Sequence, residues 1–586
     1  MTGPGDRRVR LRYLTITLMS HESVTAMRLS VTRRRLLRLL AGTGLVPAAA
    51  LAQATEPGLP DIAPLQTGPV VAEDGTLLVR RAALSGNGPG GRPLVRVQIP
   101  ERDAPVLDPA ASGPAARRLR RLVHEGRAAG NHGDLYENRD RGHSPLPPGA
   151  HPQLTHVRYA AELRKAGLDY GVAGPVIFNA PLMGNSSTAR TRGPFWRSQG
   201  RLALTRPNGG DLLYQNYVAG QIHVYPEHRD HDPANGDLFP ASTPFFLISQ
   251  GSSYSDRPHM EALAMILAAF TPETKSFLHA TQLLAPTVQM VFRRSLDPVR
   301  GREGYRSGIA HPTAIPGEQI NLTRMVGLAN ALTPETVPPM VRLAVLSETR
   351  SVEGIDYFGE GLDERLFDTP AAIARIWRSH APRRSMVVSV EATRDLQGRS
   401  PEFAWRVLRG DPARTQVEPL DASGLRARIT LDWQDPRPVP GRLDITSSRV
   451  DIGVFARTGD HDSMPGLISI LLPHHETRAY GTGPDGMSRI EARDFRLPED
   501  GYADPVLFPR TDWRDVHRYD PEGRLTGWDR ETPDGVLRFD AAGRLMTADG
   551  PRIGQKTADH VPVRHVIDRD ETGVPHLRLR KGAGPD

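Results

Sequence analysis

The stretch FFLISQGSSYSDRPHMEALAMILAAF, residues 245–270, is the clearest indication of the fold. Its first residues, Phe245–Ser249, form a short apolar run of the length typical of a buried strand. A turn rich in glycine and serine follows, and the apolar spacing of the remainder then indicates a helix beginning at Arg257 or Pro258. The stretch therefore predicts a strand, a turn and a helix in succession, which indicates a domain that contains both strands and helices.

We expect this mixed α/β main body to span residues 151–380 and to be rich in helices. Leu154–Ala166, ended by Gly167, has the composition of a helix. Three further helices are predicted where a threonine precedes a proline, because threonine caps a helix and proline suits its first position. These pairs begin at Thr271, Thr333 and Thr369.

Residues 55–150 are rich in proline, glycine and alanine and contain one clear helix candidate, Pro114–Glu125. We expect much of this N-terminal region to be extended or loosely ordered.

Residues 383–475 have a different pattern, in which apolar and polar residues alternate. The alternation in Leu425–Trp433, Phe403–Val407 and Val450–Val454 is that of strands with one buried face. Several such strands separated by turns predict a β-sandwich. The segment also resembles the PKD-like immunoglobulin-type domains of exported proteins, and the resemblance implies a spacer or a module that contacts proteins or glycans. It rests on Val388–Ala392, Asp395, Gly398, Phe403–Trp405 and Arg409–Asp411.

The tail, residues 476–586, contains a short repeat. RYDPEGRL at 518–525 recurs as RFDAAGRL at 538–545. The unit resembles the YD repeat of extracellular shell-forming proteins, in which aspartate and glycine shape a hairpin turn. Because two copies are too few for a shell, we expect a pair of β-hairpins packed on the sandwich.

Residues 1–54 have the features of a leader with a signal peptide. Arg33–Arg35 precede an apolar run, Leu39–Leu51, and small residues follow. The paired arginines ahead of Leu36-Leu37-Arg38 resemble twin-arginine leaders, whose translocase accepts folded proteins. The apolar run is too short to cross the roughly 30 Å hydrocarbon core. We therefore expect export and a periplasmic or secreted mature protein.

The leader also carries the positive charge of the chain. It holds nine arginines and two acidic residues, a surplus of seven, which equals the formal net charge of +7. The mature chain is therefore neutral, and no nucleic-acid partner is expected. The absence of cysteine excludes disulfides and thiolate-ligated metals. No apolar run of about 18 residues follows the leader, so we expect no integral membrane segment in the mature chain.

Residues 225–237 form the densest polar cluster and are the candidate metal site. Carboxylate and amide oxygens around an Asn-Gly turn suit calcium, although the spacing departs from the standard calcium loop. Imidazoles beside a carboxylate suit a transition metal such as zinc. The alternative is a surface loop held by internal hydrogen bonds. The candidate ligands are Glu227, His228, Asp230, His231, Asp232, Asn235 and Asp237.

Two further clusters are candidates for binding or catalysis. Gly251, Ser252 and Ser253 lie in the turn before a helix, where free amides favour an anion, although Asp256 as helix cap explains the turn without a ligand or catalysis. A serine nucleophile there is disfavoured, because the Gly-x-Ser-x-Gly pattern is absent. The residues 131–143, rich in histidine and acids, could complete a site with the 227–237 loop or could be a structural loop.

These patterns predict a multidomain α+β protein with a mixed, helix-rich body, an immunoglobulin-like β-sandwich and a β-hairpin tail. We expect an exported envelope or glycan-contacting protein without catalysis, stabilised by calcium. The alternative is an exported metal-dependent hydrolase that uses the 227–237 loop.

Overall fold

We analysed a computed structural model of the chain. It describes residues 71–86, 88–172, 176–186, 208–227, 241–352, 356–357, 362–439, 442–473, 475–497, 511–547, 550–552, 563–569 and 575–581. The chain divides into two compact units after Glu56, and all described residues belong to the second unit, Pro57–Asp586. The predicted leader, residues 1–54, and its predicted export signal lie outside the described residues.

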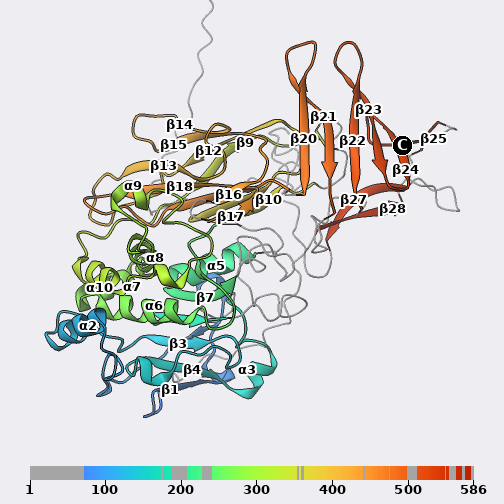
Figure 1. Cartoon of the computed structure of the whole chain (residues 1–586). Helices are drawn as coiled ribbons and strands as arrows, with labels where there is room; N and C mark the ends of the chain where they lie inside the picture. Colours follow the sequence, from blue (N-terminus) through green and yellow to red (C-terminus); the bar gives the residue numbers. More distant parts are fainter. Residues whose placement is uncertain are drawn as a thin grey trace, which may run out of the picture. The chain divides into compact units, whose positions relative to one another are not determined.

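The first part of the described chain is built on a six-stranded sheet in the order β1-β4-β3-β6-β7-β8 (Figure 1). Every neighbouring pair in this sheet is parallel. From β3 the chain passes outward to β4 and then returns across β3 to β6, β7 and β8, so the winding reverses between β3 and β6. The strands are β1 (Thr76–Val79), β3 (Leu135–Asn138), β4 (Thr155–Tyr159), β6 (Leu182–Asn185), β7 (Gln221–Glu227) and β8 (Phe246–Gln250).

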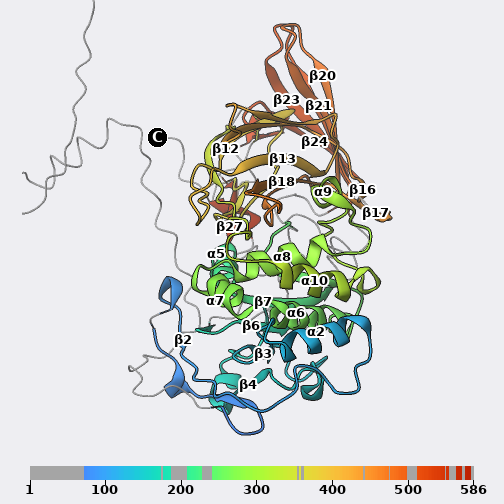
Figure 2. The same ribbon diagram turned by 90° about the vertical axis from the view of Figure 1, so that its left-hand side faces the viewer.

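Helices cover this sheet and share its apolar core. Ten residues of α6 are buried, as expected of a helix that is apolar on nearly all sides. Figure 2 shows α2, α6 and α10 side by side next to the sheet, and all three contact one another. The helices are α2 (Pro114–His124), α3 (Ala161–Lys165), α5 (Gly209–Val218), α6 (Arg257–Ala269), α7 (Pro272–Ala280), α8 (Leu284–Arg294), α9 (Gly301–Tyr305) and α10 (Leu322–Ala331). Within the described ranges, no helix combines the length and apolar character that crossing a bilayer requires.

Several predicted elements of this part are confirmed. The strand at 245–249 is β8, and the helices expected at 114–125, from Arg257 and after Thr271 are α2, α6 and α7. Thr271 caps α7 as predicted, because its Oγ1 accepts the N–H of Thr274 over 3.1 Å.

Other predictions were wrong. Residues 154–166 are not one helix, because β4 pairs with β1 and β3 before the chain turns into the short α3. Thr333 begins a turn, in which its carbonyl oxygen accepts the N–H of Thr336 over 2.9 Å. Thr369 likewise caps a turn that leads into a strand, with its Oγ1 accepting the N–H of Ala372 over 3.0 Å. Both threonines therefore begin a turn, but the residues that follow them do not form a helix.

The N-terminal region is more ordered than expected. From residue 71 onward it supplies β1, α2 and β3, so the expectation of a largely extended or loose segment was wrong for residues 71–150. The parallel sheet therefore takes strands from both sides of residue 150.

Two sheets follow and share one apolar cluster. In β15 the buried residues Ala427, Ile429 and Leu431 alternate with more exposed ones, and they join the same cluster as Ile452 of β18. The strands predicted around 403–407, 425–433 and 450–454 are confirmed. One sheet contains β10 (Arg365–Asp368), β11 (Ala372–Ile376), β19 (Gly466–Leu471), β18 (Arg449–Arg457) and β13 (Glu402–Arg409). The other contains β14 (Thr415–Pro419), β15 (Arg426–Asp432), β12 (Arg383–Ser389) and β9 (Ala344–Glu348).

The tail forms a seven-stranded antiparallel sheet in which consecutive strands pair. The two copies of the repeat lie at two of its turns, so the predicted hairpins are confirmed. In each turn the aspartate amide bonds the arginine carbonyl four residues on, and the glycine has a positive φ, 79° at Gly523 and 76° at Gly543. The strands are β20 (Glu476–Thr482), β21 (Ser488–Phe495), β22 (Trp513–Tyr519), β23 (Leu525–Thr532), β24 (Gly535–Asp540), β25 (Leu545–Thr547) and β26 (Gly550–Arg552).

Short strand pairs complete the described strands. They are β2 (Leu94–Val95) with β5 (Ile177–Phe178), β16 (Arg437–Val439) with β17 (Arg442–Ser447), and β27 (Val563–Arg569) with β28 (Pro575–Lys581).

Candidate active site

The carboxyl ends of the parallel strands bring together residues from several of the clusters found in the sequence. Asn138 ends β3, Asn185 ends β6, Glu227 ends β7 and Gln250 ends β8. The carbonyl oxygen of Glu227 accepts the N–H of Gly251 over 2.9 Å. In open α/β sheets, ligands bind at this edge, in the crevice where the winding reverses. Here that crevice lies at the ends of β3 and β6.

The polar cluster at 131–143 is divided by β3. His132 and Asp134 precede the strand and lie at its amino end, where Asp134 pairs with Lys275 over 2.7 Å. Asp140 and His143 follow the strand and lie at the carboxyl edge. Only the second half of this cluster can therefore contribute to a site at that edge.

The Asn185 side chain connects the residues of the carboxyl edge. Its Oδ1 accepts from the Tyr136 hydroxyl over 2.8 Å and from Asn138 Nδ2 over 3.2 Å. Its Nδ2 donates to the Ser144 carbonyl over 3.0 Å and to Asp256 Oδ2 over 2.8 Å. Both amide hydrogens and both oxygen lone pairs are used, which fixes the orientation of this fully buried amide. Sequence analysis did not identify Asn185, and its only signal was a polar residue ending an apolar strand.

Asp256 occupies the N-cap position of α6, but its side chain does not cap the helix. The carboxylate instead accepts from Asn185, and its Oδ1 has no hydrogen-bond partner among the described residues. Burial raises the pKa of Asp256 to about 6, although the hydrogen bond from Asn185 works in the opposite direction. The capping role expected for this side chain was therefore wrong.

The loop after β3 is held in an uncommon conformation. Asn138 Oδ1 accepts the amides of Asp140 and Gly142, over 3.2 and 2.8 Å, and its Nδ2 donates to the His143 carbonyl over 2.7 Å. Arg141 and Ser144 have φ angles of 53° and 49°, which are uncommon for residues with a side chain. Such conformations persist only where surrounding contacts impose them, and they are concentrated at functional sites.

This loop orients a histidine with a carboxylate. Nδ1 of His143 lies 3.0 Å from Oδ2 of Asp140, whose side chain is 4% exposed whereas that of His143 is 49% exposed. A carboxylate is the strongest acceptor near Nδ1, so Nδ1 carries the proton and Nε2 carries the lone pair. The arrangement is that of a histidine base held by a buried aspartate.

Ser144 is not placed as a nucleophile in this arrangement. Its Oγ lies 3.1 Å from Nδ1 of His143 and accepts the N–H of Tyr254 over 3.1 Å. A serine activated by histidine bonds the ring nitrogen opposite the aspartate, whereas here both groups lie at Nδ1. The hydroxyl therefore joins the β3 loop to the turn after β8, where Tyr254 has a φ of 72°.

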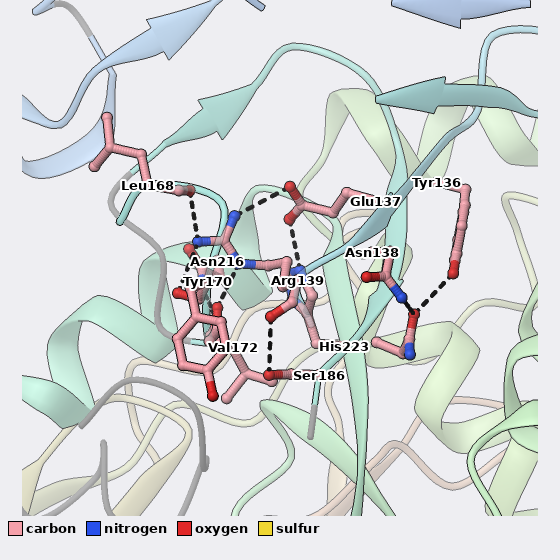
Figure 3. A network of polar contacts seen from close by, with 12 residues as sticks. Tyr136, Glu137, Asn138, Arg139, Leu168, Tyr170, Val172, Ser186, Asn216 and His223 are labelled. Atoms are coloured by element: carbon pink, nitrogen blue, oxygen red, sulfur yellow. Dashed lines mark hydrogen bonds and ion pairs between the residues drawn. The ribbon is translucent and has the colours of Figure 1, made fainter. Parts of the chain in front are cut away.

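A buried network of ion pairs and hydrogen bonds lies beside the carboxyl edge of the sheet (Figure 3). Glu137 bonds Arg139, Tyr159 and His223, over 3.1, 2.7 and 2.8 Å. Burial by itself would raise the pKa of Glu137, but the charge of Arg139 and the hydrogen bond from His223 hold that pKa at about 2. Arg139 also donates to the carbonyls of Leu168 and Tyr170, over 2.9 and 3.3 Å, and to that of Gly171. The network fixes the 168–171 segment beside the site.

The predicted metal ligands are mostly outside the described residues. Glu227 is described and buried at the end of β7. Within the part of the chain that the structure describes, no group of three or more histidine, aspartate or glutamate side chains could hold a metal. Calcium or zinc binding by the 227–237 loop therefore stays a prediction. The ligands outside that part are His228, Asp230, His231, Asp232, Asn235 and Asp237.

The predicted anion site lies at the same edge. Gly251, Ser252 and Ser253 form the exposed turn between β8 and α6, and Gly251 has a φ of 138°. Anion binding there stays a prediction.

Comparison with known proteins does not place the chain in a family. No family model and no curated protein matches it. A nucleoside hydrolase-related hypothetical protein from Saccharophagus degradans, associated with carbohydrate metabolism, aligns at 8% identity over 54% of this chain, with a TM-score of 0.18. The alignment covers 66% of that chain, slightly under two thirds of its length. The tandem Ig repeats of Dlar align at 12% identity over 27% of this chain and 85% of theirs, with a TM-score of 0.11. Scores this low do not establish a shared fold, so the site has to be interpreted from its own geometry.

Proposed function

We propose that this protein is an exported hydrolase that acts on a small polar substrate at the carboxyl edge of the parallel sheet, between β3 and β6. The observation that carries the proposal is the pair Asp140 and His143, in which a buried carboxylate holds Nδ1 and leaves Nε2 on an exposed ring. Export is supported by the leader sequence.

In the proposed hydrolysis, Nε2 of His143 accepts a proton from a water molecule as the water oxygen bonds to the electrophilic atom of the ester or glycoside. The bond from that atom to the leaving oxygen breaks, and the imidazolium returns the proton to the leaving group. Asp140 stabilises the imidazolium that forms, because its carboxylate lies at Nδ1. Asp256 is a positioning residue. It holds Asn185, whose Nδ2 also binds the Ser144 carbonyl next to His143.

A metal-bound water is the alternative source of the nucleophile. It would use Glu227 with the predicted ligands of the 227–237 loop, and it shares the same sheet edge. The alternating strands and the shared apolar cluster support a further proposal, that the two sheets between residues 344 and 471 form an immunoglobulin-like sandwich that contacts glycan or envelope components.

The proposed activity is tested with chromogenic esters, phosphate esters and glycosides. We expect turnover of one class, and we expect His143→Gln to lower kcat/KM about 10²- to 10⁴-fold, the range for loss of a general base. His132→Gln is the matched control, because this histidine precedes the same strand at its opposite end. The kcat/KM of His132→Gln should stay within about twofold of the wild type, because this substitution does not remove the proposed general base.

Two results would count against a histidine base. Unchanged turnover in His143→Gln would exclude that role. Absence of turnover of all three substrate classes, together with retention of the protein on immobilised glycan, would favour the non-catalytic envelope or glycan-contacting protein instead.

A further inference from the structure

A cavity with a partly polar lining lies away from the proposed active site. Its lining comes from the segment before β8, from β8 itself, from α8, from the loop 311–313 and from β19. The polar lining residues are Ser242, Thr243, Arg293, His311 and Thr313.

Arg293 is a buried cation without a carboxylate partner among the described residues. The residue is 5% exposed, and its bonds go to Gln289 Oε1 and to the Pro312 carbonyl, both over 3.3 Å. Burial lowers the pKa of Arg293 to about 10, so it remains charged at neutral pH. An unpaired buried charge is strongly unfavourable, so its retention in a cavity wall indicates a partner that the described side chains do not supply.

Two further arginines, Arg409 and Arg449, lie beside the cavity. Thr313 Oγ1 accepts from Arg409 over 3.1 Å and from Arg449 over 2.6 Å. Both arginines share one carboxylate, that of Asp451, at 3.5 and 2.9 Å. Arg293, Arg409 and Arg449 therefore lie in or beside the wall of this cavity, and of the three only Arg293 lacks a carboxylate partner among the described residues.

Two other lining residues have polar atoms without hydrogen-bond partners in the described part of the chain. They are Oγ1 of Thr243 and Nδ1 of His311, in residues that are 6% and 7% exposed. Nε2 of His311 lies 2.7 Å from the Tyr305 carbonyl and donates to it, so the ring is neutral, in agreement with a pKa that burial lowers to about 3. The cavity thus offers a guanidinium and a hydroxyl as donors and a ring nitrogen as acceptor.

We propose that this cavity binds a small oxyanion, such as phosphate, through the guanidinium of Arg293 and the hydroxyl of Thr243. An oxyanion supplies the negative charge that Arg293 lacks, and the planar guanidinium suits two oxygens of one anion. Because the lining includes Leu467 of β19 as well as residues of β8 and α8, the bound anion stabilises the packing of the parallel-sheet part on the β region.

The test is thermal unfolding of the full mature chain in sodium phosphate and in sodium sulfate, each against sodium chloride of equal ionic strength. A ligand that binds only the folded state raises Tm. We expect a rise of about 1–2 °C in phosphate for the wild type, which corresponds to about one to two kcal/mol in a chain of this size. Arg293→Met should abolish the rise and leave Tm in chloride unchanged or higher, because the substitution removes an unpaired buried charge.

Arg294→Met is the matched control on the same helix, since Arg294 does not line the cavity. It should keep the phosphate-dependent rise. If Arg293→Met does not fold, Arg293→Lys is used instead. It replaces the planar guanidinium by a single ammonium charge and should weaken phosphate binding, measured by calorimetry, about tenfold. An equal rise in Arg293→Met, an unchanged affinity in Arg293→Lys, or no rise of the wild type in either oxyanion would overturn the proposal.

Discussion

Asn185 and Asp256 are 71 residues apart in the sequence, yet Asn185 Nδ2 donates a 2.8 Å hydrogen bond to Oδ2 of Asp256. The bond joins the end of β6 to the start of α6 and places an aspartate with a raised pKa behind the β3 loop. It lies at the point where the winding of the sheet reverses, and several predictions depend on this edge.

Asp256 should destabilise the protein at neutral pH. Its pKa is raised from 3.8 to about 6, so between these values the folded state binds more protons than the unfolded state, and stability falls as pH rises. Asp256→Asn keeps the shape without the charge and should be more stable than the wild type at pH 7.5 by on the order of 1–3 kcal/mol. Urea unfolding at pH 4.5 and 7.5 measures this difference, which should shrink at the lower pH. The same advantage at both values would contradict the pKa.

Glu137 should stabilise the protein above its unfolded-state pKa. Its pKa is lowered from 4.5 to about 2, so its contribution is present above pH 4.5 and is lost as pH falls toward 2. Glu137→Gln leaves Arg139 buried without its partner and should lower the free energy of unfolding at pH 7 by about 3–5 kcal/mol.

The control for Glu137 is Glu125→Gln, which removes surface pairs with Arg121 and Arg127 at 3.9 and 3.4 Å. Exposed pairs contribute about 0–1 kcal/mol. Denaturant unfolding at pH 7 and pH 3 compares the two variants. A loss in Glu137→Gln as small as that of the control would mean that the buried network does not stabilise the fold.

Asp140→Asn tests the orientation of His143. An amide at this position no longer fixes the proton on Nδ1 or stabilises the imidazolium, so kcat should fall about 10²- to 10⁴-fold with little change in KM. Steady-state kinetics with whichever of the three test substrates the wild type turns over, ester, phosphate ester or glycoside, measures both constants. Asp169→Asn is the control, because this buried carboxylate lies 3.8 Å from Arg141 and pairs with it rather than with His143. Similar losses in both variants would indicate a general structural effect.

Gly523 should be required by its turn in the tail. Its φ of 79° is unfavourable for alanine, and the added Cβ would meet Nη2 of Arg489 at 2.7 Å, a side-chain end that can move. Gly523→Ala should therefore lower stability by about 1 kcal/mol, chiefly through backbone strain. At Gly149 no atom lies within 4 Å of an added Cβ, and Gly149→Ala should have no such effect. Thermal unfolding of both variants checks the difference, and equal Tm values would count against the strain.

The sequence by itself determined the elements whose signals are local. The apolar spacing of α6, the alternation in β15 and the aspartate and glycine of the repeated turns each act within a few residues, and all three are found in the structure. The zero formal net charge of residues 55–586 also follows from composition alone.

Only the tertiary structure decided how these elements combine. Residues 155–159 form a strand because they pair with two parallel neighbours, β1 and β3. The sequence of so short a segment does not show whether such partners exist. The division of the 131–143 cluster by β3, and the contact of Asp256 with Asn185, likewise depend on strands joined through intervening segments. Parallel strands that pair are far apart in the sequence. The site at their carboxyl ends therefore cannot be predicted from hydrophobic periodicity or turn residues, which are local signals.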